Sequence, residues 1–150
     1  MIIHTDEQIF AILKKIRHKQ PIIAGNREHI ERVVQSTLDR AAYAITENKI
    51  NPDTPPWLDD YALIGAAPEL LQDRPYHNES FAAMLLDKHQ RYGDGPMTRW
   101  GHAGLIIRID SKWERYKNLK AGGDTEDTLK DILGYCVLGF AYQEYLNAQS

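Results

Sequence analysis

The chain of 150 residues has the length of one ordinary domain, and its 43% hydrophobic and 26% charged residues are typical of soluble globular proteins. The formal net charge of −3 argues against a nucleic-acid-binding protein that works through bulk positive charge. The chain lacks the basic start and apolar run of a signal peptide, and no apolar stretch is long enough to cross a bilayer. We therefore expect a cytoplasmic protein without a membrane partner, in which the single cysteine, Cys136, is a buried residue in a reducing compartment.

The first 50 residues predict two helices. Thr5 and Gln8 have the spacing of a capping box, in which each side chain pairs with the backbone N–H of the other residue. Apolar residues then recur at helical spacing until Pro21 ends the segment. A second helix with one apolar side is predicted to start at Asn26. We therefore expect residues 1–50 to form a helical hairpin.

Residues 51–77 contain five of the seven prolines, a composition that interrupts regular structure. We expect an irregular connection with a short turn of helix between Trp57 and Leu63. Trp57 and Tyr61 are expected to pack against the rest of the chain, because a long loop with bulky apolar residues seldom stays free in solvent. The alternative is a linker between two small units.

Residues 78–150 predict a helical core. Residues suited to the two ends of a helix divide this region into three helices: from Asn78 to residue 92, from Thr98 to about residue 121, and from Asp124 to about residue 147. No segment alternates apolar and polar residues as a strand does. The sequence thus predicts an all-α fold of about five helices in one compact domain.

The helix predicted after Thr98 has three sectors when its residues are placed at intervals of about 100°. One sector is apolar and includes His102 and Trp113. Two charged groups flank it: an acidic pair, Asp110 and Glu114, and a basic row, Arg108, Lys112 and Arg115. Taken alone, these charges are typical of a solvated helix face with ion pairs between successive turns.

Asp127 and Asp131 stand one turn apart on the last predicted helix, which is apolar on nearly all sides. These acids are therefore expected at the edge of the core, where an unpaired carboxylate is costly. The cation that they need is either an Arg or Lys side chain or a metal ion. With the acidic pair of the preceding helix, the two aspartates would form an oxygen-only site suited to Mg²⁺ or Mn²⁺. The metal would activate a water for attack on phosphorus, while the basic row would hold the remaining phosphate charge.

Three segments, HQRYGDGP, GLIIRIDSKWERYKNL and EDTLKDILGYCVL, resemble a small all-α family of phage and bacterial proteins described as nucleotide-modification-associated. They also resemble, more distantly, the MazG-like nucleotide pyrophosphohydrolases, and the likeness covers residues 79–145. It implies a MazG-like helical bundle, a homo-dimer or homo-tetramer, and Mg²⁺-dependent hydrolysis of a nucleoside triphosphate to a monophosphate and pyrophosphate. In this resemblance Asp127 and Asp131 match the second acidic pair and are the candidate catalytic residues.

The chain departs from the MazG-like pattern at the first acidic pair. It has no Glu-x-x-Glu before the last helix, and Asp110 and Glu114 are the nearest substitute, at a different spacing. Ser111 stands where the nucleotide-modification-associated relatives are expected to have an acid before Lys112. These departures leave nucleotide binding more secure than catalysis.

Further contacts to a nucleotide are predicted on either side of the basic row. The turn from Tyr92 to Asp94 is placed to close over a base or sugar, and a plain helix terminus is the alternative. His89 is a candidate general base or base-edge contact, although an imidazole on an apolar helix face is more often simply packed. Asn118 continues the basic row by one turn.

Three functions fit these patterns, in this order. The first is Mg²⁺-dependent hydrolysis of a nucleoside triphosphate, in the host cytoplasm if the protein is phage-encoded. The second is capture of a nucleotide, or of a nucleotide signal of host defence, without cutting it, with the basic row as phosphate clamp. The third is a structural or interaction protein whose charges form internal salt bridges. None of the three has duplex nucleic acid as its partner.

Overall fold

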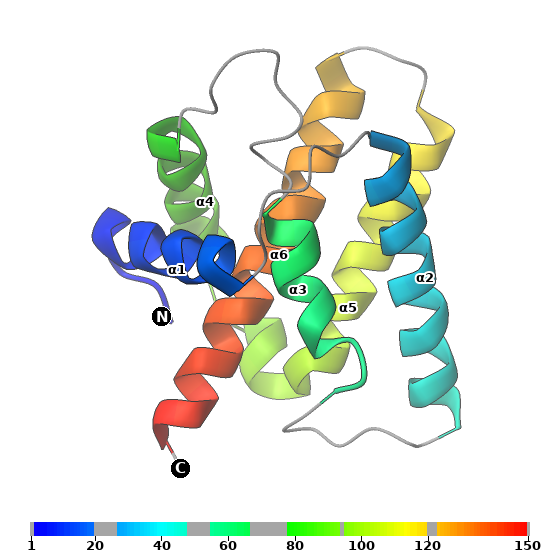
Figure 1. Ribbon diagram of the computed structural model, residues 1–150, viewed down its shortest axis with the longest axis horizontal. Helices are drawn as coiled ribbons and strands as arrows, with labels where there is room; N and C mark the ends of the chain where they lie inside the picture. Colours follow the sequence, from blue (N-terminus) through cyan, green and yellow to red (C-terminus); the bar gives the residue numbers. More distant parts are fainter. Residues whose placement is uncertain are drawn as a thin grey trace.

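The computed structural model describes residues 2–19, 27–47, 55–66, 78–93, 95–119 and 123–149, and all regular structure in these ranges is α-helical (Figure 1). The helices are α1 (Asp6–Lys19), α2 (Arg27–Thr46), α3 (Leu58–Gly65), α4 (Asn78–Tyr92), α5 (Gly95–Asn118) and α6 (Gly123–Gln149). The predicted all-α class is confirmed. The helix beyond the expected five is α3, for which the sequence indicates only a short turn. No helix in the ranges described is long and apolar enough to cross a bilayer.

The start of α1 has the capping box that the sequence predicts. The backbone N–H of Gln8 donates to Thr5 Oγ1 at 3.3 Å, and the backbone N–H of Thr5 donates to Gln8 Oε1 at 3.0 Å. The N–H of His4 donates to the same Oε1. These bonds satisfy backbone donors that the first turn of a helix leaves without a partner, so they fix where α1 begins. The helix then buries Ile9 and Ile16 on one side.

The first two helices do not form the expected hairpin. α1 packs mainly against α4, and also against α3 and α6, whereas α2 packs against α5 and α3. Figure 1 shows α1 and α2 on different sides of α3. Each helix buries one apolar stripe, as its periodicity predicts, but α1 packs against α4 and α2 against α5, and both contact α3. A stripe of this kind indicates that a helix has a partner without indicating which helix the partner is.

α6 is the central helix and packs against α5, α3 and α1. Its side chains are buried on nearly all sides, and Leu133 and Val137 are 0% exposed. Cys136 is buried among them as predicted, and burial raises the pKa of its thiol. α3 approaches α6 closely at Gly139, where an added Cβ would lie 2.6 Å from the ring of Tyr61. The crossing of α3 over α6 therefore requires a residue without a side chain at this position.

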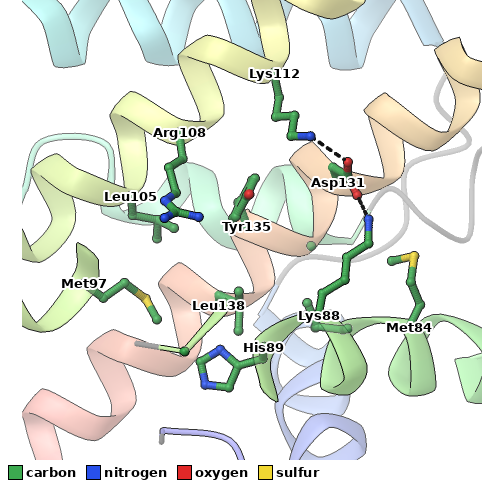
Figure 2. A pocket seen from close by; sticks show the side chains of 13 residues that line it. Met84, Lys88, His89, Met97, Leu105, Arg108, Lys112, Asp131, Tyr135 and Leu138 are labelled. Carbon is green, nitrogen blue, oxygen red and sulfur yellow. Dashed lines mark hydrogen bonds and ion pairs between the residues drawn. The ribbon is translucent and has the colours of Figure 1, made fainter. Parts of the chain in front are cut away.

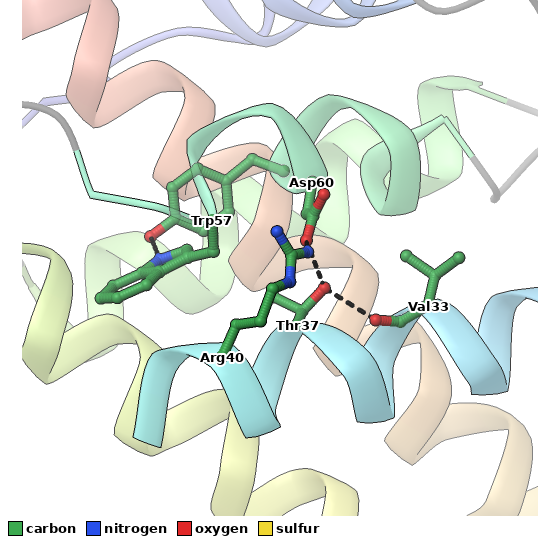
Figure 3. Close-up of polar contacts among 6 residues, drawn as sticks. Val33, Thr37, Arg40, Trp57 and Asp60 are labelled. Atoms are coloured by element: carbon green, nitrogen blue, oxygen red, sulfur yellow. Dashed lines mark hydrogen bonds and ion pairs between the residues drawn. The ribbon is translucent and has the colours of Figure 1, made fainter. Parts of the chain in front are cut away.

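A small polar cluster fixes α3 to α2 (Figure 3). The carboxylate of Asp60 accepts hydrogen bonds from the guanidinium of Arg40 and from Thr37, whose Oγ1 lies 2.7 Å from Asp60 Oδ2. The same Oγ1 lies 2.7 Å from the carbonyl oxygen of Val33, so one hydroxyl proton serves two acceptors. Because the Asp60 side chain is largely buried, its pairing with Arg40 compensates a charge at the edge of the core.

A chain of buried hydrogen bonds joins α3 to α5 and α6. Trp57, which is buried with Tyr61 as predicted, donates from Nε1 to Tyr61 Oη at 2.8 Å. Tyr61 Oη in turn donates to His102 Nδ1 at 3.0 Å, and His102 Nε2 donates to Gln143 Oε1 at 3.0 Å. These donors and acceptors match when the imidazole of His102 is neutral, with its proton on Nε2. Burial lowers the pKa of His102 and so favours this neutral form.

The buried His102 predicts a loss of stability in mild acid. Its pKa in the folded chain is below the ordinary value of 6.5. At pH values between the pKa of the folded chain and that of the unfolded chain, the unfolded chain binds a proton that the folded chain does not. The free energy of unfolding should therefore fall as the pH drops from about 7 to about 5, by about 1.4 kcal/mol for each unit of pKa difference. Urea denaturation across this pH range measures the slope.

A pair of histidine variants separates this effect from general acid sensitivity. His102→Gln should flatten the pH slope, while the same change at the exposed His18 on α1 should leave it as in the parent protein. A slope that His102→Gln does not alter would contradict the role assigned to the buried imidazole.

The sequence predicts one continuous helix beginning at Thr98, and the structure differs at both ends and inside it. The helix starts at Gly95 and ends at Asn118. Thr98 does not act as the N-cap, because it lies within the first turns and its Oγ1 donates to the carbonyl oxygen of Gly95 at 3.1 Å. Gly101 interrupts the helix with φ 63° and ψ −146°, a conformation that residues with a side chain rarely adopt. His102 is therefore the first residue of the long regular part of α5.

Candidate ligand-binding site

A pocket of about 370 Å³ lies between α4, α5 and α6 (Figure 2). α4 packs mainly against α1, and it also borders this space through Met84, Leu85, Lys88 and His89, together with residues of α5 and α6. The volume is at the lower end of the range of about 300–1,000 Å³ that is common for small-molecule sites. The pocket thus has the size of a small-molecule site.

One end of the pocket is charged. Asp131 on α6 accepts from Lys88 Nζ on α4, and its other oxygen lies 3.1 Å from Lys112 Nζ on α5. The Asp131 side chain is 14% exposed, so its charge has little contact with water. The two lysine ammonium groups compensate this charge. Of the two partners that the sequence leaves open for this carboxylate, the structure places ammonium groups against it. The ion pairs also connect the three helices around the pocket (Figure 2).

Arg108 is a second source of positive charge in the pocket wall. It stands one turn before Lys112 on α5, and Figure 2 shows its guanidinium directed into the space between α5 and α6. Among the described residues, no carboxylate pairs with Arg108 and no side chain accepts a hydrogen bond from it. Among the residues that the structure describes, Arg108, Lys88 and Lys112 give the wall three positive charges and Asp131 gives it one negative charge, a formal sum of +2. A locally positive wall in a chain whose net charge is −3 favours an anionic ligand.

The other end of the pocket is largely apolar. Met97 and Leu105 from α5 line it together with Leu138 from α6, and Figure 2 shows them on the side away from Asp131. His89 from α4 also lines this end and is 2% exposed. Its burial agrees with the sequence prediction of a packed imidazole, and its place in the lining is compatible with the prediction of a ligand contact. A pocket with one cationic end and one apolar end fits a ligand that has an anionic group attached to a flat or apolar body.

The structure does not bring the four predicted metal ligands together. Of the four, only Asp131 lines the pocket. Asp127 is exposed, Asp110 is exposed, and Glu114 forms a surface ion pair with Lys117 at 2.7 Å. Within the ranges that the structure describes, no three His, Cys, Asp or Glu side chains are grouped so that they could hold a metal ion.

The reason for this separation is the geometry of α5. Residues at positions 108 and 112 of a helix are about 40° apart, whereas position 110 is turned about 200° from position 108. If Arg108 and Lys112 face the pocket, Asp110 and Glu114 must face away from it. The acidic pair and the basic row can therefore not both serve one site on α6.

The predicted ligand contacts divide between pocket and surface. Arg108, Lys112 and His89 line the pocket. Arg115 does not: it is exposed, and its Nε donates to Thr128 Oγ1 at 3.4 Å. Asn118 is exposed at the end of α5. The side chain of Tyr92 and the whole of Asp94 lie outside the described residues, although Gly93 between them has φ 69° and lines the pocket.

Sequence reasoning missed Lys88, Met84 and Met97 as pocket residues. Lys88 follows Met84 by one turn and precedes His89, which places it at the edge of the buried side of α4. That position alone indicates a cation near the core. It does not indicate Asp131 as the partner, because the partner is 43 residues further along the chain.

Comparisons with protein-family models, with curated proteins and with solved structures found no match to this chain. The resemblance to nucleotide-modification-associated and MazG-like proteins therefore stays a prediction, and function is inferred from the pocket itself.

Proposed function

We propose that the protein binds a small phosphorylated molecule of nucleotide type in the pocket between α4, α5 and α6, and that it does so without a metal ion. The observation that carries this proposal is Arg108, a guanidinium directed into the pocket with no carboxylate partner among the described residues. A guanidinium forms two parallel hydrogen bonds to a phosphate, and the ammonium of Lys112 one turn away adds a point charge.

Capture of the ligand is better supported than hydrolysis. The hydrolytic mechanism expected from the sequence needs carboxylates that are available to hold Mg²⁺ next to the phosphates. In the pocket, Asp131 is the acid in question, and its two oxygens are already bonded to Lys88 and Lys112. The cations of the wall can neutralise phosphate charge directly, so binding does not depend on a metal.

Isothermal titration calorimetry with the ribonucleoside mono- and triphosphates tests this proposal. Each titration is made once in EDTA and once with Mg²⁺, and the nucleotide recovered afterwards is identified by mass spectrometry. We expect stoichiometric binding of at least one nucleotide, with the same Kd in both buffers and with the nucleotide recovered intact. Because charge attraction contributes, Kd should increase as salt is added.

Two results would contradict the proposal. The absence of binding by every nucleotide in both buffers would remove the pocket as a nucleotide site. Binding that appears only with Mg²⁺, accompanied by monophosphate and pyrophosphate as products, would favour the metal-dependent hydrolase that the sequence predicts first.

A further inference from the structure

The carboxylate of Asp131 stands in the part of the pocket wall where a phosphate chain would have to extend. Lys88 and Lys112 approach it from α4 and α5, and Arg108 lies one helical turn from Lys112 on the side of the apolar end. A ligand whose body occupies the apolar end thus meets Arg108 and Lys112 first. Any further phosphoryl group would continue toward Asp131 (Figure 2).

The formal charge of the wall fits one phosphoryl group. The three cations and one carboxylate among the described lining residues give a sum of +2, and a phosphate monoester carries about −1.5 to −2 at pH 7. Without the carboxylate the sum would be +3, which suits a longer phosphate chain better. Like charges held close together in a partly buried site repel strongly, so a second or third phosphoryl group next to Asp131 is disfavoured.

We infer that Asp131 is a specificity-determining residue that limits the ligand to a single phosphoryl group, so that the pocket takes a nucleoside monophosphate in preference to a triphosphate. This inference rests on the proposed function and adds the class of nucleotide to it. Asp131 contributes in two ways: it removes part of the positive charge of Lys88 and Lys112, and it places a negative charge where the β- and γ-phosphates would lie.

Asp131→Asn tests the inference, because it removes the charge and keeps the shape of the side chain. The affinities of the adenosine, guanosine, cytidine and uridine mono- and triphosphates are measured by calorimetry in EDTA for the parent protein and for the variant. In the parent protein the monophosphate of the preferred base should bind more tightly. In Asp131→Asn the triphosphate should gain at least about tenfold relative to the monophosphate.

Asp127→Asn is the matched control, since it is the same substitution one turn away on α6, at an exposed side chain outside the pocket lining. It should leave the ratio of the two affinities unchanged. Lys88→Gln is a second test, in which the relative affinity for the triphosphate should change in the opposite direction. This test does not depend on whether Asp131→Asn folds. Lys88→Gln leaves Asp131 less neutralised, so it should weaken triphosphate binding more than monophosphate binding.

Three results would overturn the inference. One is a parent protein that prefers the triphosphate. Another is an Asp131→Asn protein in which both affinities change by the same factor, which is what a purely structural ion pair would produce. If no mono- or triphosphate binds the parent protein at all, the proposed function fails and the inference fails with it, whereas the first two results leave the proposed function standing.

Discussion

The substitution Gly139→Ala is expected to lower the free energy of unfolding by about 3 kcal/mol, at the upper end of what overpacking of a core typically costs. An added Cβ would lie 2.6 Å from two atoms of the Tyr61 ring, much closer than carbon atoms can approach. The ring cannot move aside easily, because Tyr61 is 1% exposed and its hydroxyl is bonded to both Trp57 and His102. Urea denaturation, with the midpoint and the slope both recorded, measures the change.

Gly134→Ala on the same helix is the matched control. There an added Cβ would lie 3.3 Å from Leu85 Cδ1, the end of a flexible side chain that can shift. Alanine is the better helix former by about 1 kcal/mol, and this gain offsets part of the contact in both variants. If Gly139→Ala proves as stable as Gly134→Ala, the close crossing of α3 over α6 is wrong.

The substitution Arg108→Gln is expected to weaken binding of the preferred nucleotide at least about 30-fold, or about 2 kcal/mol. The change removes the two parallel hydrogen bonds that a guanidinium gives to phosphate, and it lowers the formal charge of the wall by one. Stability should change little, because no ion pair or hydrogen bond within the described residues depends on Arg108. Calorimetry gives the Kd, and thermal denaturation of the free protein checks the fold.

Arg115→Gln is the control for Arg108→Gln, on the same helix and with the same loss of charge. Arg115 belongs to the basic row that the sequence predicts, but the structure places it outside the pocket and against Thr128. We expect its replacement to leave the Kd within about twofold, since salt screens an exposed charge that lies outside the pocket lining. Equal losses in the two variants would mean that general charge attraction, and not the pocket, holds the ligand.

Local features of the fold were predictable because they depend on residues that are close in sequence. The capping box of Thr5 and Gln8 requires only the correct spacing of two side chains, and the structure contains both of its hydrogen bonds. The apolar sector of α5 is likewise a matter of periodicity, and His102 and Trp113 are buried as it predicts. The all-α class follows from such local patterns.

Features that depend on distant partners were not predictable in the same way. The apolar stripes of α1 and α2 are real, but nothing in either stripe indicates that α1 packs against α4 and α2 against α5, although both contact α3. Gly101 has the sequence context of an ordinary helical residue, and its left-handed conformation is evident only in the structure. Close approach at Gly139 also requires knowledge that Tyr61 lies opposite.

The candidate site shows the same division. The apolar surroundings of the last helix correctly indicate that Asp131 lies at the edge of the core and needs a cation, whereas Asp127, expected there too, is exposed. These surroundings do not decide between a metal and a lysine, because Lys88 comes from a helix far away in sequence. Arg108 and Lys112 share a helix face, so their joint position in the pocket follows from helical geometry. The prediction that Arg115 lies with them was wrong, because Arg115 is outside the pocket lining and contacts Thr128.

The most direct test of the central claim is to observe the pocket during ligand binding. The chain contains three methionines, and two of them, Met84 and Met97, line the pocket on α4 and α5. NMR spectra of protein labelled with ¹³C at the methionine methyl groups, assigned with Met84→Leu and Met97→Leu, would be recorded as the preferred nucleotide is added in EDTA. Both methyl signals should shift and saturate together at the Kd from calorimetry, and in Arg108→Gln both should shift much less at the same concentrations. Saturable nucleotide binding that leaves both signals in place would show that the ligand binds elsewhere and would contradict this account.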